Sequence, residues 1–267
     1  GFSGSAGTAV ITKTEARLWT DGRYFIQAAA QLEGTTVELM KMGEPGVPEM
    51  NAYIEEVLKE GETLGFDGRV VSVGEGEGYA AIARKKNAKV NYQVDLIDEI
   101  WEDRPVLSEE PAFDLDVKYA GENVASKLAR IREEMKEAGT NVHVVSTIDD
   151  ICWTLNIRGN DIDFFPLVLS YGIIKMDSFE LYIDERKLDD KLKAKLAKDG
   201  VNLHPYNDIY EDVKKFGSDV VAMIDPGKLN YALFNNIPEN VKTVKKRNPA
   251  ILMKAVKNPV EIENIRK

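Results

Sequence analysis

One order of predicted elements occurs twice in this chain, and this internal repeat restricts the fold more than any other feature. Two β-prone runs, a helix, a strand, a second helix and another strand follow one another in residues 8–67, and the same order returns in residues 167–225. A unit of about 160 residues is far longer than the repeat of a solenoid. The sequence therefore predicts tandem domains of one α/β fold.

Two short motifs set the alignment of the copies. Thr20-Asp21-Gly22-Arg23 aligns with Ile183-Asp184-Glu185-Arg186 at a separation of 163 positions (184 − 21). Gly65-Phe66-Asp67 aligns with Met223-Ile224-Asp225 at a separation of 158 positions (225 − 67). The difference falls in the loop at residues 43–48. An alignment that holds on both sides of a length change supports two copies of one unit.

Apolar periodicity and glycine positions predict the elements of the first copy. Asp21 is placed to cap its first helix. Gly74-Glu75-Gly76-Glu77-Gly78 is expected to be a flexible loop, because its glutamates would repel the phosphate that a glycine-rich loop can bind. The expected strands are residues 8–12, 16–20, 36–40 and 63–67, and the expected helices are residues 25–32, 50–59, 79–86 and 91–101.

The second copy has a helix and a strand at its front that the first copy lacks. These are residues 123–138 and 142–146. Their absence from the first copy predicts that further sequence precedes Gly1. Behind them we expect strands at residues 167–170, 179–183, 201–204 and 220–225, and helices at residues 188–198 and 208–216.

A linker rich in proline and acidic residues, at positions 104–111, separates the copies. We therefore expect one domain at residues 1–110, truncated at its front, and a second at residues 111–253. Residues 254–267 are interpreted as the start of the first helix of a further domain. Both ends thus have the character of internal sequence, and the chain is interpreted as a piece of a longer protein.

Charge and cysteine content restrict the partners and the compartment. The net charge is −10, which argues against nucleic acid or an anionic membrane as the main partner, because both require a basic surface. No apolar run is long enough to span a membrane. The only cysteine, Cys152, permits no internal disulfide, and the chain is expected to be cytoplasmic.

The stretch from Cys152 to Ile162 has the composition of a site. Trp153, Asn156, Arg158 and Asp161 alternate with apolar residues, so the apolar side chains can be buried while the polar ones meet a partner at a loop. The alternative is local structure, in which Arg158 and Asp161 pair with each other and a glycine closes a turn. Spacing alone leaves both interpretations open.

Other candidates for chemistry in this sequence are weak. His143 and His204 are the only histidines, and each lies in an apolar strand run typical of a structural residue. Asp149 and Asp150 are adjacent, so they are expected to cap or pair locally instead of binding a metal. Cys152 has no histidine close in sequence. These residues predict neither a nucleophile nor a metal site.

Three stretches in their order and spacing resemble the Xaa-Pro aminopeptidases (aminopeptidase P), specifically the three-domain cytosolic type. They are Gly1 to Thr8 with Leu18 to Tyr24, Trp153 to Ile162, and Lys254 to Ile262. The resemblance covers essentially the whole chain. It implies two tandem creatinase N-terminal-type domains of ribonuclease-H-like α/β fold with mixed sheets, followed by a catalytic domain of pita-bread fold that is absent here.

The resemblance also implies a function. Such enzymes are hydrolases that remove an N-terminal residue preceding proline with two divalent metals, usually manganese, held by residues downstream of this chain. No catalytic residue, metal ligand or cofactor is therefore assigned here, and the chain alone is expected to be inactive. Trp153, Asn156, Arg158 and Asp161 are expected to shape the substrate entrance or to contact the chain's own catalytic domain.

The resemblance also bears on the oligomeric state, and two other functions are possible alternatives. Family members are commonly homodimers, but the contacts usually assigned to the catalytic domain are missing here, so a monomer or weak dimer is expected. One alternative is a stand-alone, non-catalytic binding module. Another is a prolidase-like or creatinase-like relative, against which the internal repeat counts, because such relatives normally carry a single N-terminal domain.

Overall fold

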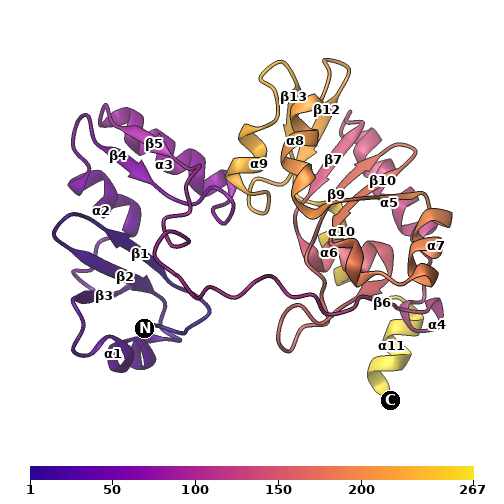
Figure 1. Ribbon diagram of the computed structural model, residues 1–267, viewed down its shortest axis with the longest axis horizontal. Coiled ribbons are helices and arrows are strands. Elements are labelled where there is room, and N and C mark those ends of the chain that lie inside the picture. Colours follow the sequence, from indigo (N-terminus) through magenta and orange to yellow (C-terminus); the bar gives the residue numbers. More distant parts are fainter. The chain divides into compact units, whose positions relative to one another are not determined.

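A computed structural model describes residues 1–267 as two units (Figure 1). The first consists of Gly1–Gly65 and Gly78–Asn91, and the second of Phe66–Glu77 and Tyr92–Lys267. Each combines helices with mixed sheets, as the sequence predicts. No helix combines the length and the apolar character that a membrane crossing requires.

The first unit contains two separate small sheets. β1 pairs antiparallel with β2, and β2 pairs parallel with β3, while β4 and β5 form a parallel pair of their own. Its core is correspondingly small and centres on Trp19, Met40 and Tyr53. The elements are β1 (Thr8–Ile11), β2 (Ala16–Thr20), α1 (Phe25–Leu32), β3 (Val37–Lys41), α2 (Met50–Val57), β4 (Thr63–Gly65), α3 (Val73–Lys85) and β5 (Lys89–Asn91).

The second unit is built on one sheet with the strand order β11-β10-β9-β7-β12-β13. β9 runs antiparallel to both of its neighbours, and the other pairs are parallel. The strands are β7 (Val142–Val145), β9 (Ser170–Lys175), β10 (Phe179–Ile183), β11 (Val201–His204), β12 (Val221–Ile224) and β13 (Lys242–Lys245). A further short pair joins β6 (Phe113–Asp114) and β8 (Ile157–Arg158).

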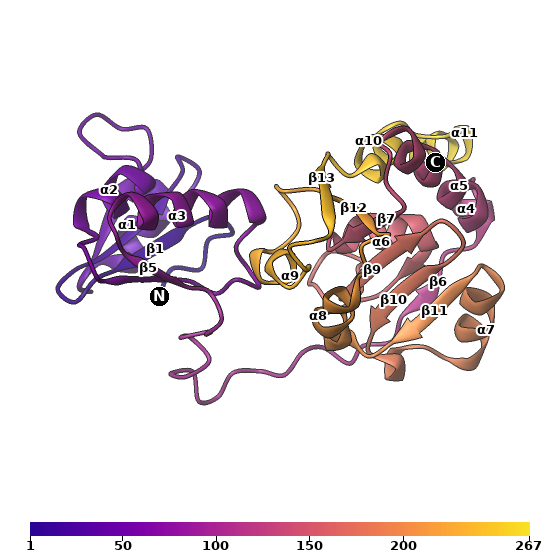
Figure 2. The ribbon, with the colours of Figure 1, turned by 90° about the horizontal axis from the view of Figure 1, so that it is seen from above.

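Helices cover both faces of this sheet. Figure 2 shows α5 and α10 on one side and α8 on the other. Alternate strand residues supply two separate cores, so Ile174 packs with one set of helices and Ile173 with the other. The helices are α4 (Val117–Ala120), α5 (Val124–Glu137), α6 (Ile148–Leu155), α7 (Asp190–Lys198), α8 (Ile209–Asp212), α9 (Tyr231–Asn235), α10 (Pro249–Ala255) and α11 (Pro259–Arg266).

The predicted repeat is confirmed at the level of strand register. Thr8 pairs with Trp19 in the first copy, and Tyr171 pairs with Tyr182 in the second, each 163 positions later. The aligned turns are also alike, since the Asp21 carboxylate accepts hydrogen bonds from the backbone N–H and guanidinium of Arg23. Asp184 does the same for Arg186.

The prediction that Asp21 caps the first helix is wrong. Its carboxylate is occupied by Arg23, and α1 begins after Tyr24 with no side-chain cap. The strand expected at residues 167–170 is also misplaced, because β9 is Ser170–Lys175. Residues 161–168 are instead held in a turn by the Asp161 side chain, which accepts a hydrogen bond from the Leu169 N–H at 2.6 Å.

Two further predictions in the first copy are wrong. Gly74 to Gly78 belong to α3 instead of a loop, because Ser72 and Glu75 form a reciprocal cap at the helix start. The helix expected at residues 91–101 is absent, and β5 ends at Asn91. Its apolar side chains find no surface to cover, and a short helix without tertiary packing is marginal in water.

Candidate functional site

The stretch singled out in the sequence is half helix and half turn. Cys152, Trp153 and Leu155 lie in α6, which ends at Asn156 in a left-handed conformation with φ of 52°. Trp153 and Asn156 are buried, so the Asn156 side chain meets its polar partners inside the unit, at the end of a helix. Asparagine is one of the few residues that tolerates this conformation, so it suits the helix end.

A buried lysine organises this helix end. The Lys127 ammonium donates to the Trp153 carbonyl at 2.7 Å and to Asn156 Oδ1 at 2.6 Å, and it lies 4.4 Å from the centre of the Trp153 ring. Burial lowers the pKa of Lys127 to about 8, against the raising effect of Glu122 and Glu261. The sequence gives no signal for Lys127 other than its position on the buried face of α5.

Arg158 and Asp161 do not pair with each other, so the ion pair that the local-structure alternative proposed is absent. Arg158 Nη1 donates to the carbonyls of Cys152, at 2.9 Å, and Ile157, at 2.8 Å. It therefore satisfies backbone groups at the end of α6. Burial lowers the pKa of Arg158, and its side chain is partly accessible.

Asp161 pairs instead with Lys187, the residue that directly follows the Ile183–Arg186 motif. Lys187 Nζ lies 2.5 Å from Asp161 Oδ2, and the two side chains are 2% and 0% exposed. The other carboxylate oxygen, Oδ1, is buried without a hydrogen-bond partner. Gly159 is required nearby, because a Cβ there would lie 2.9 Å from Val168 Cβ. The turn therefore has a rigid base.

The tip of this turn is exposed and apolar. Phe164 is fully exposed, at 100%, and Phe165 and Ile162 are also exposed. Phe164 has φ of 68°, an uncommon conformation for a bulky residue that costs roughly 1–2 kcal/mol. Asp161 thus anchors a tip that presents two aromatic rings to solvent, as binding surfaces do.

The histidines and the cysteine have structural surroundings. His143 is buried, with its ring nitrogens 3.1 Å from the Met223 carbonyl and 3.2 Å from Asn248 Oδ1, and burial lowers its pKa. His204 Nε2 contacts Glu180 at 2.7 Å. Burial raises the pKa of the Cys152 thiol to about 11, so it is not a thiolate at neutral pH. No group of three or more potential metal ligands comes together.

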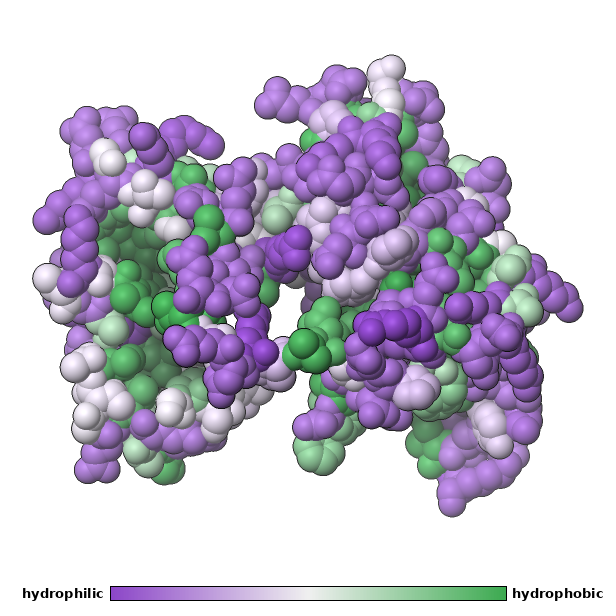
Figure 3. Space-filling model, in the orientation of Figure 1, coloured by the Kyte–Doolittle hydropathy of each residue, from purple (hydrophilic) through white to green (hydrophobic).

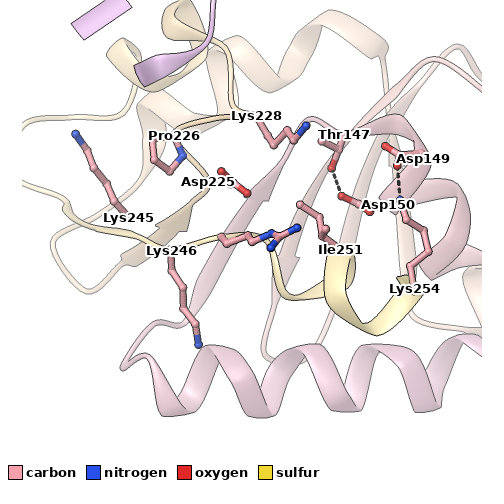
Figure 4. Close-up of a pocket in the computed structure, with 11 residues that line it drawn as sticks. Thr147, Asp149, Asp150, Asp225, Pro226, Lys228, Lys245, Lys246, Ile251 and Lys254 are labelled. Carbon is pink, nitrogen blue, oxygen red and sulfur yellow. Dashed lines mark hydrogen bonds and ion pairs between the residues drawn. The ribbon is translucent and has the colours of Figure 1, made fainter. Parts of the chain in front are cut away.

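A cavity of about 500 Å³ opens at the carboxyl ends of β7, β12 and β13 (Figure 4). Asp150, which is buried, accepts from Thr147 at 2.6 Å and pairs with Lys254 at 2.7 Å, and Lys254 also contacts Asp149. Asp150 thus binds Thr147 locally, as expected, but both aspartates also pair with Lys254, which lies in α10 and is distant in sequence.

Comparison with known proteins assigns both halves of the chain to one kind of domain. Residues 1–102 and residues 103–261 each match a model described as the creatinase/prolidase N-terminal domain. Aminopeptidase P2 of Arabidopsis thaliana is 40% identical over 239 residues, which are 88% of this chain and 34% of that protein. Aminopeptidase P1 of the same plant is 34% identical over 293 residues, covering 100% of this chain and 45% of that protein.

A solved structure agrees with these matches. The X-prolyl aminopeptidase of Caenorhabditis elegans, described as a cytosolic enzyme with a di-nuclear active site, superposes with a TM-score of 0.94 at 33% identity. The match covers 99% of this chain and 44% of that one. The chain therefore spans less than half the length of these relatives.

Proposed function

Because the chain belongs to the creatinase/prolidase N-terminal domain family, we propose that it is the N-terminal region of an Xaa-Pro aminopeptidase. Such an enzyme is a hydrolase that removes the residue preceding proline from a peptide N-terminus. The observation that carries the proposal is the identity of 34–40% to aminopeptidases P along 88–100% of this chain, through both repeats. Its substrates would be peptides with proline at the second position.

Catalysis is proposed to reside beyond these residues. The two histidines lie apart in separate hydrogen-bond networks, and no cluster here fits a pair of metals. A di-nuclear centre, which we expect to hold manganese, would therefore be supplied by another part of the whole protein. We propose a cytoplasmic location, which the description of the Caenorhabditis elegans relative as cytosolic supports.

The proposed role of the candidate site is to present a rigid contact surface to that catalytic region. Trp153 and Asn156 are buried and accept hydrogen bonds from Lys127, which holds the end of α6 in place. Asp161 holds the base of the turn through its ion pair with Lys187. The exposed ring of Phe164 then supplies the contact. Arg158 lies within electrostatic range of Glu261 in the first turn of α11. This surface would form the interdomain contact or the substrate entrance.

The first test is hydrolysis of a short Xaa-Pro peptide with and without manganese. We expect activity only from the whole protein and none from residues 1–267 alone, which we also expect to be a monomer or weak dimer. Manganese-dependent activity of residues 1–267 would place the active site within them and refute the proposal. Absence of activity from both proteins would favour a non-catalytic binding module.

The second test addresses the site within the whole enzyme. Phe164→Ser should raise the KM for peptides or loosen the catalytic region, because it removes an exposed aromatic contact. Arg158→Ala should change peptide kinetics or stability. Ile26→Ser, at another exposed apolar position in the first unit, and Arg247→Ala, at an exposed arginine of the second unit, serve as controls. Kinetics and stability that match the controls for both variants would contradict the proposed role.

A further inference from the structure

His143 is a buried histidine with a hydrogen-bond acceptor on each side of its ring. It lies in β7 and is 1% exposed, whereas hydrophilic residues dominate the surface of the second unit that Figure 3 shows. Its Nδ1 lies 3.1 Å from the Met223 carbonyl oxygen, and its Nε2 lies 3.2 Å from Asn248 Oδ1. Both oxygens can only accept, and a neutral imidazole has a single N–H, so the neutral ring satisfies only one of the two contacts.

The Asn248 side chain does not resolve this conflict by exchanging its oxygen and nitrogen. Its Oδ1 accepts from the Ala250 N–H at 3.1 Å and thereby caps α10, and its Nδ2 donates to Asp150 Oδ2 at 2.8 Å. The exchange would place an NH2 group against the Ala250 N–H and an oxygen against the Asp150 carboxylate. These two contacts therefore keep Oδ1 facing His143.

Carboxylates from two elements favour a positive charge on the His143 ring. They belong to Asp225, at the end of β12, and to Asp150, in α6. Asp150 is bound in turn by Lys254, in α10, at 2.7 Å (Figure 4), which weakens its effect. Burial opposes the charge more strongly, so the pKa of His143 lies below its ordinary value of 6.5. The ring is therefore neutral at neutral pH and takes up a proton only in acid.

β9 and α5 complete the surroundings of His143. β9 places the apolar Ile174 opposite His143 in the strand register. α5 covers the same face of the sheet, and its Glu134 is paired with Lys246 at 2.9 Å. Burial and the two carboxylates therefore decide when the ring takes up its proton.

We propose that His143 is a pH-sensitive switch for the start of α10. The neutral ring donates from Nδ1 to the Met223 carbonyl, which is the shorter contact, and its Nε2 lone pair faces Asn248 Oδ1 without a hydrogen bond. A proton from solvent adds an N–H at Nε2, which donates to Asn248 Oδ1 and fixes the residue that caps α10. Acid therefore strengthens the start of this helix.

The switch has opposite effects on the helix and on the whole unit. Because the folded pKa of His143 is lowered, the unfolded chain binds more protons as the pH falls below 6.5. The free energy of unfolding of the second unit therefore decreases in acid until the folded ring takes up its proton. General acid loosening would weaken both the helix and the unit, so better protection of α10 in a less stable unit is specific to this switch.

Nitrogen NMR of the histidine rings tests the proton itself, because residues 1–267 contain only two histidines. His143 should show one N–H, on Nδ1, at about pH 8, and a second, on Nε2, after titration below pH 6.5. His204→Gln assigns the two sets of signals by removing one of them.

Amide exchange in the same titration tests the effect on α10. The Ala250 N–H, which Asn248 caps, should become about tenfold better protected when Nε2 of His143 is protonated. The Glu261 N–H, which Asn258 caps at the start of α11, should not change and is the matched control.

Two variants separate the histidines. His143→Leu should abolish the rise in protection at Ala250, whereas His204→Gln should preserve it. A His143 ring that stays neutral until the second unit unfolds would overturn the proposal, as would a ring with two N–H groups at about pH 8. Protonation of Nε2 without better protection of Ala250 would also overturn it. These outcomes are measured on the unmodified chain, so they decide the question even if His143→Leu does not fold.

Discussion

In the first repeat Asp21 binds Arg23 across a tight turn, and in the second Asp184 binds Arg186 with the same atoms. The cores above these turns differ greatly. The first unit buries three large residues together around Trp19, whereas the second forms two clusters that cover both faces of a continuous sheet. Equal local motifs thus coexist with unequal cores, and only the second sheet contains a strand in the position of β7.

A second comparison shows how closely the repeats still match. Within the second unit, the Val73 N–H donates to the Leu229 carbonyl at 2.9 Å, and the Tyr231 N–H donates to the Val71 carbonyl at 2.8 Å. Tyr231 lies 158 positions after Val73 (231 − 73), and Leu229 lies 158 positions after Val71 (229 − 71). The two donors are therefore equivalent residues of the two copies, and so are the two acceptors. Equivalent turns therefore bind each other with local two-fold symmetry, as in an isologous interface.

The largest expected effect comes from the buried ion pair, which only the second repeat has. Asp161→Ala leaves Lys187 charged and unpaired in the interior, and we expect the free energy of unfolding of the second unit to fall by about 3–5 kcal/mol. Amide exchange resolves each unit separately. The double variant Asp161→Leu with Lys187→Met should recover most of this loss. A loss below about 1 kcal/mol for the single variant would contradict the assignment.

The next prediction compares equivalent side chains. Ile174→Ala should destabilise the second unit by about 2–5 kcal/mol, because it leaves a cavity beside β7. Ile11→Ala should change the first unit by no more than about 0.5 kcal/mol, because that side chain is already in water. Free energies from amide exchange test both. Equal losses would mean that Ile11 is packed and that the comparison is wrong.

The same contrast explains which parts of the fold were predictable from sequence. The repeat, the tandem domains and most elements follow from apolar periodicity and from two short motifs, because those signals are local. The split sheet does not follow from the same signals, since pairing of β7 with β9 and β12 joins segments far apart in the chain. Residues 91–101 show the same limit, because their helical pattern finds no surface to pack on.

The candidate site, like the fold, was predictable from sequence only in part. The importance of the stretch around Trp153 and Asp161 could be predicted from its composition, but its partners could not. Lys127 and Lys187 come from other elements, and each looks like an ordinary surface lysine in the sequence. Burial, which depends on tertiary packing, is what distinguishes them.

The pH dependence of stability should distinguish the units, because Lys127 lies in the helix that has no counterpart in the first repeat. Its folded pKa is about 8, below the value of roughly 10.4 for an unfolded lysine. Between these values the unfolded chain binds more protons, so this group makes the second unit more stable as pH rises, by up to about 1.4 kcal/mol per pH unit.

Lys127→Met should abolish this rise, whereas Lys136→Met, at an exposed position of the same helix, should preserve it. Urea unfolding between about pH 7 and pH 10 measures the slope. A slope that is unchanged by Lys127→Met would show that the ammonium is better solvated than its burial indicates.

The smallest effects are expected at the matched turns. Hydrogen bonds from Arg23 lower the pKa of Asp21 to about 2, and those from Arg186 also lower the pKa of Asp184. Each carboxylate therefore stabilises its turn above the unfolded pKa, and the contribution is lost as pH falls through the folded pKa. Asp21→Asn and Asp184→Asn should each lower Tm only slightly at pH 7, and the difference from the unmodified chain should shrink as pH falls through the folded pKa of each carboxyl group. Equal shifts would show that the turn is a local module that does not depend on sheet closure, whereas a much larger shift for Asp184→Asn would show that the complete sheet strengthens it.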